Sequence, residues 1–211
     1  MTPLLAVLAV AFVAWFAGGS IWNVRKGRAA LRWIQEGLPL LGARTTMRWL
    51  GTTAIELVLR EAQAPFDQVT LIVFLEPRDV PWMWALGRSR GRRDTLILRA
   101  RLRKAPAADL EAIDRSTWSG RDALPRLARE TWSVREPAGG SRLATFYKAP
   151  AALARADTLL EVAGRDRLAV RRLSVRRNDP HLQLHVDLPG APASSRRFFE
   201  SVRALGERAD G

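Results

Sequence analysis

Two histidines and one aspartate are the residues best placed to do chemistry in this sequence. His181, His185 and Asp187 lie in the segment HLQLHVDL, where polar and apolar residues alternate. Alternation of this kind predicts a β-strand with the three side chains on one face. His185 and Asp187 would lie about 7 Å apart, so a third ligand from a neighbouring strand would make them a weak candidate metal site. A solvent-facing strand explains the same pattern better, and we expect no metal and no cofactor.

Several motifs that mark enzymes are missing from the sequence. It has no G-x-x-x-x-G-K-[ST], G-x-G-x-x-G or H-E-x-x-H segment. It has no cysteine, which excludes disulfides, thiolate metal sites and cysteine nucleophiles. Asp109, Glu111 and Asp114 form an acidic group on a predicted helical turn, where a solvated surface is the simpler interpretation. The catalytic residues therefore stay undefined, and a non-catalytic protein is favoured over an enzyme of an unrecognised family that uses His185 and Asp187.

An apolar segment near the N-terminus predicts a membrane-spanning helix. Residues 4–22, LLAVLAVAFVAWFAGGSIW, contain no charged side chain. At about 1.5 Å per residue, a helix of this length crosses a hydrocarbon core of about 30 Å. The residues before it lack the basic charge of a signal peptide, so we expect an uncleaved signal anchor over residues 1–22. Trp22 would lie at the interface between lipid and water.

Charge around this span predicts its orientation. No basic side chain precedes it, and four follow it closely: Arg25, Lys26, Arg28 and Arg32. Basic residues stay on the cytoplasmic side of a membrane, so the rest of the chain is expected in the cytoplasm, anchored in the cell membrane by a single pass.

Residues 23–42 predict a juxtamembrane helix and linker. Val24, Leu31, Ile34 and Leu38 recur at helical spacing, and Gly37 followed by Pro39 ends the pattern. This apolar stripe would either pack on the chain's own domain or contact a partner helix or lipid headgroups. We favour packing on the domain.

Residues 43–211 show the patterns of an α+β domain. Strands are predicted at 45–50, 52–61, 69–76, 95–103, 141–148, 168–176 and 181–188. Helices are predicted at 120–128, capped by Ser119, at 149–164, and after Ser194 or Ser195. Short connections favour a mixed or mainly antiparallel sheet with helices packed on it. The domain could divide into two subdomains near 134–141.

The chain is strongly basic. It has 34 Lys and Arg against 21 Asp and Glu, a net charge of +13, and almost all of the positive charge is arginine. Such a balance favours anionic lipids, an acidic membrane protein or nucleic acid as partners, although a GC-rich genome would produce the same arginine bias. A basic strand face is predicted from Arg99, Arg101, Arg103, Arg172 and Arg176. Nucleic acid is the less favoured partner because exposed aromatic residues for base stacking are lacking, and no small-molecule substrate can be named.

The segment VPWMWALGRSRGRRD, residues 80–94, joins tryptophans to a run of arginines. Asp79 is expected to cap a short helix that has Pro81 in its first turn. Trp82 and Trp84 would either cover the sheet or lie among lipid headgroups, with the arginines contacting anionic lipid. The predicted membrane-interface residues here are Trp82, Trp84, Arg88, Arg90, Arg92 and Arg93. The sequence thus predicts a membrane-anchored protein whose basic domain is an interaction or accessory module beside the bilayer; a membrane-tethered nucleic-acid binder is a further alternative.

Overall fold

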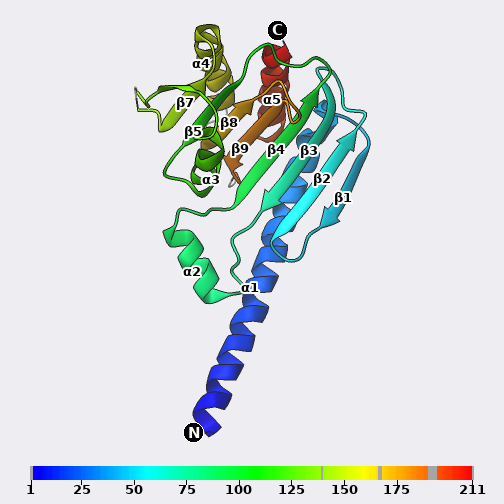
Figure 1. The fold of residues 1–211 in the computed structure, drawn as a ribbon. Helices are drawn as coiled ribbons and strands as arrows, with labels where there is room; N and C mark the ends of the chain where they lie inside the picture. The colour runs from blue at the N-terminus through cyan, green and yellow to red at the C-terminus, as the bar shows by residue number, and fades with distance from the viewer. Residues whose placement is uncertain (1, 139, 166–167, 190–193, 211) are drawn as a thin grey trace.

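A long N-terminal helix carries a domain built on one sheet (Figure 1). The computed structural model describes residues 2–138, 140–165, 168–189 and 194–210. Helix α1 spans Thr2–Gly37 without a break, and the short 3-10 helix η1, Leu38–Leu40, ends it at the expected Gly-Leu-Pro sequence. The first half of α1 projects away from the domain, and the second half lies along it.

All strand pairs of the sheet are antiparallel in the described part of the chain. The strands are β1 (Thr45–Trp49), β2 (Ala54–Arg60), β3 (Phe66–Phe74), β4 (Thr95–Leu102), β5 (Leu110–Asp114), β6 (Ser133–Arg135), β7 (Leu143–Tyr147), β8 (Val170–Val175) and β9 (Leu182–Asp187). Their order is β1-β2-β3-β4-β9-β8-β5-β7-β6. The predicted α+β class with a mainly antiparallel sheet is confirmed.

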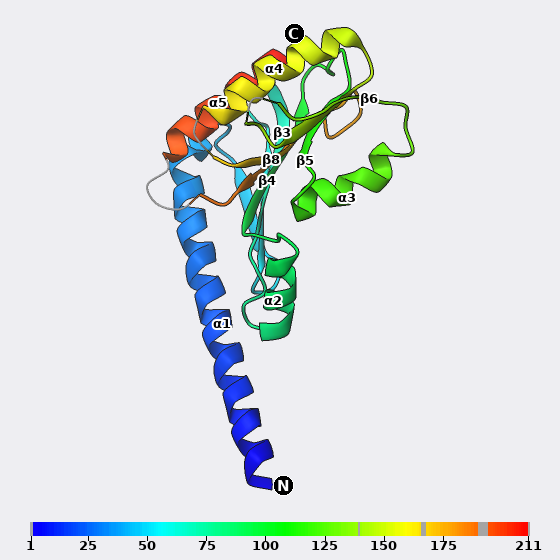
Figure 2. The same ribbon diagram turned by 90° about the vertical axis from the view of Figure 1, so that its left-hand side faces the viewer.

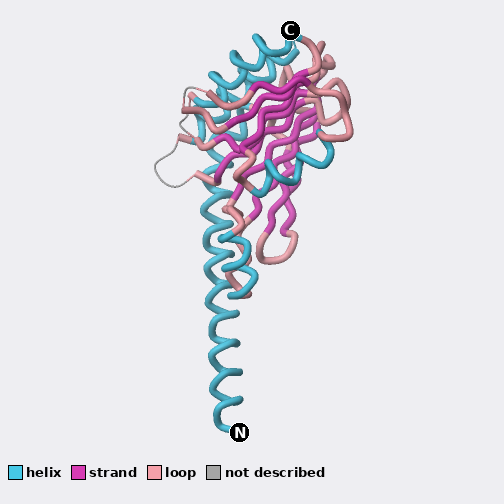
Figure 3. Tube along the Cα trace, turned by 60° about the vertical axis from the view of Figure 1, so that its left-hand side comes forward, coloured by secondary structure: helices cyan, strands magenta, loops and turns pink. Residues whose placement is uncertain are grey.

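Helices cover the two faces of the sheet unequally (Figure 2). The remaining helices are α2 (Pro81–Ser89), α3 (Trp118–Leu127), α4 (Pro150–Gly164) and α5 (Ser195–Asp210). The second half of α1, together with α4 and α5, lies on one face, which we call the helical face. Of the helices in the described residues, α3 alone lies on the opposite face, which we call the open face. Helix α2 lies beyond the sheet, on the side from which α1 projects, as Figure 3 also shows.

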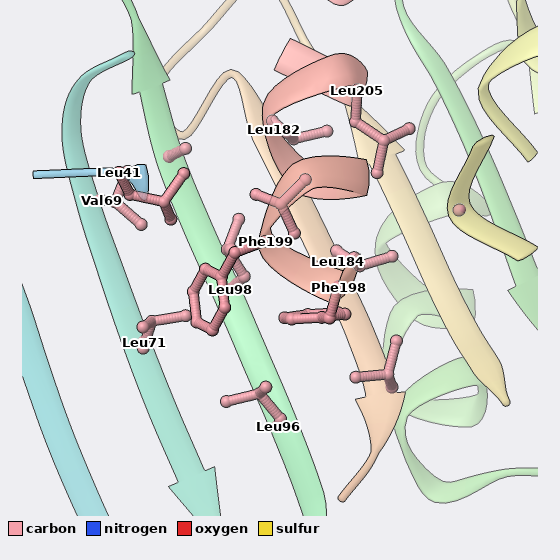
Figure 4. Close-up of a cluster of buried hydrophobic side chains, with 14 of the residues drawn as sticks. Leu41, Val69, Leu71, Leu96, Leu98, Leu182, Leu184, Phe198, Phe199 and Leu205 are labelled. Atoms are coloured by element: carbon pink, nitrogen blue, oxygen red, sulfur yellow. The ribbon is translucent and has the colours of Figure 1, made fainter. Parts of the chain in front are cut away.

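The main core lies between the sheet and the helical face. Leu71, Leu98 and Leu184 project from neighbouring strands toward Phe198 and Phe199 of α5 (Figure 4). All five side chains are buried. Burial of residues of this size stabilises the fold by about 1.5–3 kcal/mol each, because apolar surface leaves water.

The second half of α1 belongs to this core. Leu31, Ile34 and Leu38 are buried in it, and Trp33 lies 5.4 Å from Phe198, centroid to centroid. The apolar stripe therefore packs on the chain's own domain, as favoured from the sequence. These contacts join the second half of α1 to the core of the domain.

A smaller core lies under α3 on the open face. Ile113 of β5 and Phe146 of β7 pack there against Ala123 and Leu127 of α3. The predicted division near 134–141 falls between β6 and β7, which are paired neighbours in the same sheet.

Three local predictions were wrong. The acidic segment expected as a helical turn forms strand β5 instead, because it pairs on both sides with β7 and β8. Helix α3 begins at Trp118, and its N-cap is Thr117, whose Oγ1 accepts a hydrogen bond from the Gly120 amide at 3.2 Å; Ser119 is not the cap. The N-cap of α2 is Val80, because the Asp79 carboxylate accepts the Thr52 hydroxyl instead, at 2.9 Å.

Candidate membrane-facing site

The first half of α1 is long and apolar enough to cross a membrane. An 18-residue window within Pro3–Leu40 has a mean hydropathy of 2.3, and none of it is buried by the protein. Large apolar side chains such as Leu8, Phe12 and Trp15 are exposed around it. The length, composition and exposure of this helix therefore fit a membrane-spanning or signal-anchor helix.

The α2 segment packs beside this apolar part of α1. The rings of Phe12 and Trp82 are stacked, with centroids 5.7 Å apart and an interplanar angle of 14°. Closer to the domain, the Trp15 indole N–H donates to the Arg78 carbonyl oxygen at 2.9 Å. A side chain at Gly19 would collide with the backbone, because its Cβ would lie 2.6 Å from the Asp79 Cα. The glycine therefore allows the loop before α2 to touch the helix.

The outer surface of α2 is apolar and largely exposed beyond the contact of Trp82 with Phe12. Trp82, Met83 and Leu86 are 62%, 50% and 52% exposed. No residue of α2 is buried. Trp84 turns the other way and is half-buried, with its indole N–H donating to Glu76 Oε2 at 2.8 Å. The two tryptophans predicted to act together therefore face different surroundings, and neither lies in the sheet core.

A network of charged side chains fixes α2 to α1 and to the sheet. We call Lys26, Glu76, Arg78, Arg88 and Asp94 the junction cluster. Arg78 donates to both Asp94 oxygens, at 2.9 and 2.8 Å, and pairs with Glu76 at 3.0 Å. Lys26 of α1 also pairs with Asp94, and Arg88 of α2 pairs with Glu76 at 3.3 Å.

Glu76 and Asp94 of this cluster are almost fully buried. Burial opposes the ionisation of Asp94, but hydrogen bonds from Arg78, Lys26 and the Glu76 amide outweigh it and lower the pKa of this carboxyl group. Removing one partner from such a buried network costs about 3–5 kcal/mol, because the remaining charge is left without compensation. The orientation of α2 relative to α1 is therefore strongly specified.

An apolar hollow of about 390 Å³ opens between the two helices. It is lined by Trp15, Trp22 and Trp84, with Gly18 and Gly19 as its floor and Arg78 at its edge. The indole walls suit an apolar group such as an acyl chain, whereas the Arg78 guanidinium is already paired with Glu76 and Asp94.

The other predicted interface cations reach no carboxylate in the part of the chain that the structure describes. These are Arg25, Arg28, Arg32, Arg90, Arg92 and Arg93. Arg92 lies over the Trp118 ring at 5.8 Å, and Arg93 donates to the carbonyl oxygens of Arg88 and Arg92 at 3.0 and 2.7 Å. Their charges stay available to an external anion.

The predicted basic strand face is mostly neutralised by acidic residues. Arg101 pairs with Asp67, and Arg103 donates to the carbonyl oxygens of Phe66 and Ala62, both at 3.2 Å. Arg172 and Arg176 both reach the fully buried Glu111. Arg99 is exposed and has no acidic partner among the described residues. These five arginines share the open face, but they do not form one continuous cationic surface.

His185 and Asp187 do share the open face, as the alternation predicted. The expectation of a solvent-facing strand was wrong, because His185 is buried and Asp187 is partly covered. Asp187 is held by Arg171, whose Nε and Nη2 donate to it at 2.9 and 2.6 Å. His181 Nδ1 accepts the Leu102 amide at 3.1 Å. No group of three metal-binding side chains occurs among the described residues.

One motif escaped the sequence reasoning. Gly87–Gly91 reads GRSRG and matches G-x-S-x-G, the pattern of a nucleophile elbow. An elbow requires a turn from a strand into a helix, whereas Ser89 ends α2 and its hydroxyl donates to the Leu86 carbonyl at 2.9 Å. Position in the fold therefore gives Ser89 a structural role.

No protein-family model matches this chain, and no curated protein sequence is similar to it.

Proposed function

We propose that this protein is a single-pass membrane protein whose basic α+β domain is a non-catalytic interaction or accessory module on the cytoplasmic surface. In this proposal α1 is the anchor, and the outer surface of α2 is a second contact with the bilayer. The observation that carries the proposal is the stacking of Trp82 on Phe12, with Trp82, Met83 and Leu86 left uncovered.

The depth of α2 follows from its contacts with α1. Phe12 precedes Trp22, the end of the apolar run, by about 15 Å of helix rise. A helix whose tryptophan stacks on Phe12 lies beside the apolar segment and not above it. If this segment crosses the membrane, the outer surface of α2 enters the leaflet from which the domain emerges.

The chemistry of α2 suits contact with a lipid leaflet. Its outer side chains, Trp82, Met83 and Leu86, are large and apolar, and such side chains partition from water into lipid. Arg90, Arg92 and Arg93 follow at its C-terminal end, and each basic residue near an anionic membrane contributes about 1 kcal/mol to binding. Anionic phospholipid is therefore the proposed partner of this surface.

Photo-crosslinking tests the proposal with the full-length chain. Because the chain has no cysteine, Met83→Cys introduces a single thiol that carries a benzophenone. In vesicles that contain phosphatidylglycerol, we expect phospholipid adducts at this position, detected by mass spectrometry. Thr158→Cys, exposed on α4 at the far end of the domain, is the matched control and should give none.

The same two variants separate the parts of the proposal. If Met83→Cys forms adducts with a protein in native membranes and none with lipid in vesicles, the partner of this surface is a protein and not lipid. Thr158→Cys should resist a membrane-impermeant maleimide in intact cells and react after lysis; reaction in intact cells would reverse the orientation. If alkaline carbonate releases the full-length chain from membranes, α1 is not a membrane anchor.

A further inference from the structure

A small cavity on the open face lies apart from the α2 surface. It is enclosed by the strand ends of β4 and β9, the first turn of α3 and the loop after α2, and its volume is about 60 Å³. Thr95, Ser119, Arg92, Arg93 and His185 are among the residues that line it. A water molecule needs about 10–15 Å³ on this measure, so the cavity has room for a few waters or for one small polar group.

His185 supplies a buried hydrogen-bond donor without a partner. The residue is only 4% exposed, and its Nε2 lies 2.7 Å from the Gln183 amide nitrogen, which donates to it. Burial, then the charges of Arg172 and Arg99, lowers the pKa of His185 to about 3, so the ring is neutral near pH 7. A neutral ring that accepts at Nε2 carries its proton on Nδ1.

This Nδ1 atom has no hydrogen-bond partner among the described residues. A buried donor left unpaired costs about 1–3 kcal/mol, and His185 lines the cavity, so an acceptor that entered the cavity and reached this donor would bind favourably. The lone pair of His185 Nε2 already accepts a hydrogen bond, and Nδ1 carries a proton. Neither ring nitrogen can therefore bind a metal ion, so the cavity suits a hydrogen-bond acceptor and not a metal.

The charges around the cavity also favour an anion. Its one carboxylate, Asp187, is neutralised by Arg171, which pairs with Asp114 as well. Arg92 and Arg93 have no carboxylate partner in the described part of the chain, as noted above. Arg92 and Arg93 therefore give the cavity an excess of positive charge, and the N-terminus of α3, whose first amides point out of the helix, adds a partial positive charge.

From the unpaired His185 donor, the two arginines and the cavity's size, we infer that this cavity binds one phosphate or carboxylate group. The group is either a free small anion or the terminal part of a larger molecule, such as the phosphomonoester headgroup of phosphatidic acid. A whole nucleotide is too large for the enclosed volume. This inference does not depend on whether α2 enters the bilayer.

Histidine NMR tests the inference. The chain has two histidines, so ¹⁵N-histidine labelling of the full-length protein in phosphatidylcholine nanodiscs gives two assignable rings. Inorganic phosphate should shift the Nδ1–H signal of His185 in a saturable manner and leave His181 unchanged. Nanodiscs that contain phosphatidic acid without free phosphate form the second arm. A response in either arm supports the site and identifies the source of the group.

Variants exclude a non-specific charge effect. Arg92→Gln and Arg93→Gln should each weaken phosphate binding about tenfold, the loss expected of one charged hydrogen bond. Arg99→Gln, on the same face but outside the cavity, should change it less than twofold. The inference is overturned if His185 responds in neither arm, if its proton is on Nε2, or if all three variants weaken binding equally.

Discussion

On the open face, Arg172 and Arg176 reach the buried Glu111, whereas Arg90, Arg92 and Arg93 after α2 reach no carboxylate in the described residues. Both regions are rich in arginine. The open-face arginines compensate a carboxylate that could not otherwise be buried. The arginines after α2 leave their charge at the surface, next to an uncovered apolar helix. Whether an arginine is available to a partner therefore depends on the acid it meets in the fold, and not on the local density of arginine.

The largest effect should follow from breaking the open-face network. Glu111→Gln leaves Arg172 and Arg176 partly uncompensated and should lower the free energy of unfolding by about 3–5 kcal/mol. Arg93→Gln should change it by less than about 0.5 kcal/mol. Urea unfolding of the full-length protein in detergent measures both. Equal effects would mean that the two regions do not differ as described.

A second, smaller effect concerns pH. Above about 6.5 His185 is neutral in both the folded and the unfolded chain, so it adds no pH dependence. Below that value His185 binds a proton in the unfolded chain. In the folded chain it stays neutral until the pH approaches its pKa of about 3. Stability should therefore fall by about 1.4 kcal/mol per unit as pH decreases from 6.5.

The window between pH 6.5 and 5 isolates this effect, because most carboxylates titrate lower. Over it the loss should be about 2 kcal/mol. His185→Gln should remove the slope, whatever its effect on stability at neutral pH. A slope unchanged in the variant would assign the pH dependence to other groups.

A third effect should appear where α2 meets α1. Gly19→Ala places a Cβ against the Arg78 backbone and should cost about 1–3 kcal/mol through overpacking. Gly18→Ala, whose Cβ would meet nothing within 4 Å, is the matched control and should be neutral. Thermal unfolding in detergent compares the two variants. If Gly19→Ala also proves neutral, the contact between the loop and the helix is not a tight one.

The smallest effect should come from the exposed pair of Arg101 and Asp67, both half-exposed at the sheet surface. Arg101→Gln should cost no more than about 1 kcal/mol, because solvent screens an exposed ion pair. The same urea titration measures it. A loss as large as that of Glu111→Gln would show that burial does not separate the two kinds of pair.

The elements of the fold were more predictable than the site. The apolar run, the strand alternation and the stripe at Leu31 and Ile34 were readable because their periods reflect burial directly. The pairing of β5 was not, because its acidic residues read as a solvated turn until Glu111 meets Arg172 and Arg176, and Asp114 meets Arg171.

The site depends on contacts between distant segments. Asp94 joins Lys26 and Arg78, which are separated from it and from each other in the sequence by whole elements. The sequence left open whether Trp82 and Trp84 cover the sheet or lie among lipid headgroups. Because they are two positions apart on α2, about 200° around the helix, Trp82 contacts Phe12 and Trp84 contacts Glu76. The different surroundings of Trp82 and Trp84 depend on the position of α1 beside the loop before α2, which the sequence pattern does not give.

The central claim is that the outer surface of α2 lies within a lipid leaflet beside α1. Fluorescence quenching of an environment-sensitive label at Met83→Cys, in vesicles containing lipids spin-labelled at two depths, measures this directly. The account predicts quenching by the acyl-chain label and protection from aqueous iodide, with the reverse at Thr158→Cys. Strong iodide quenching at both positions, with none from either lipid label, would contradict it.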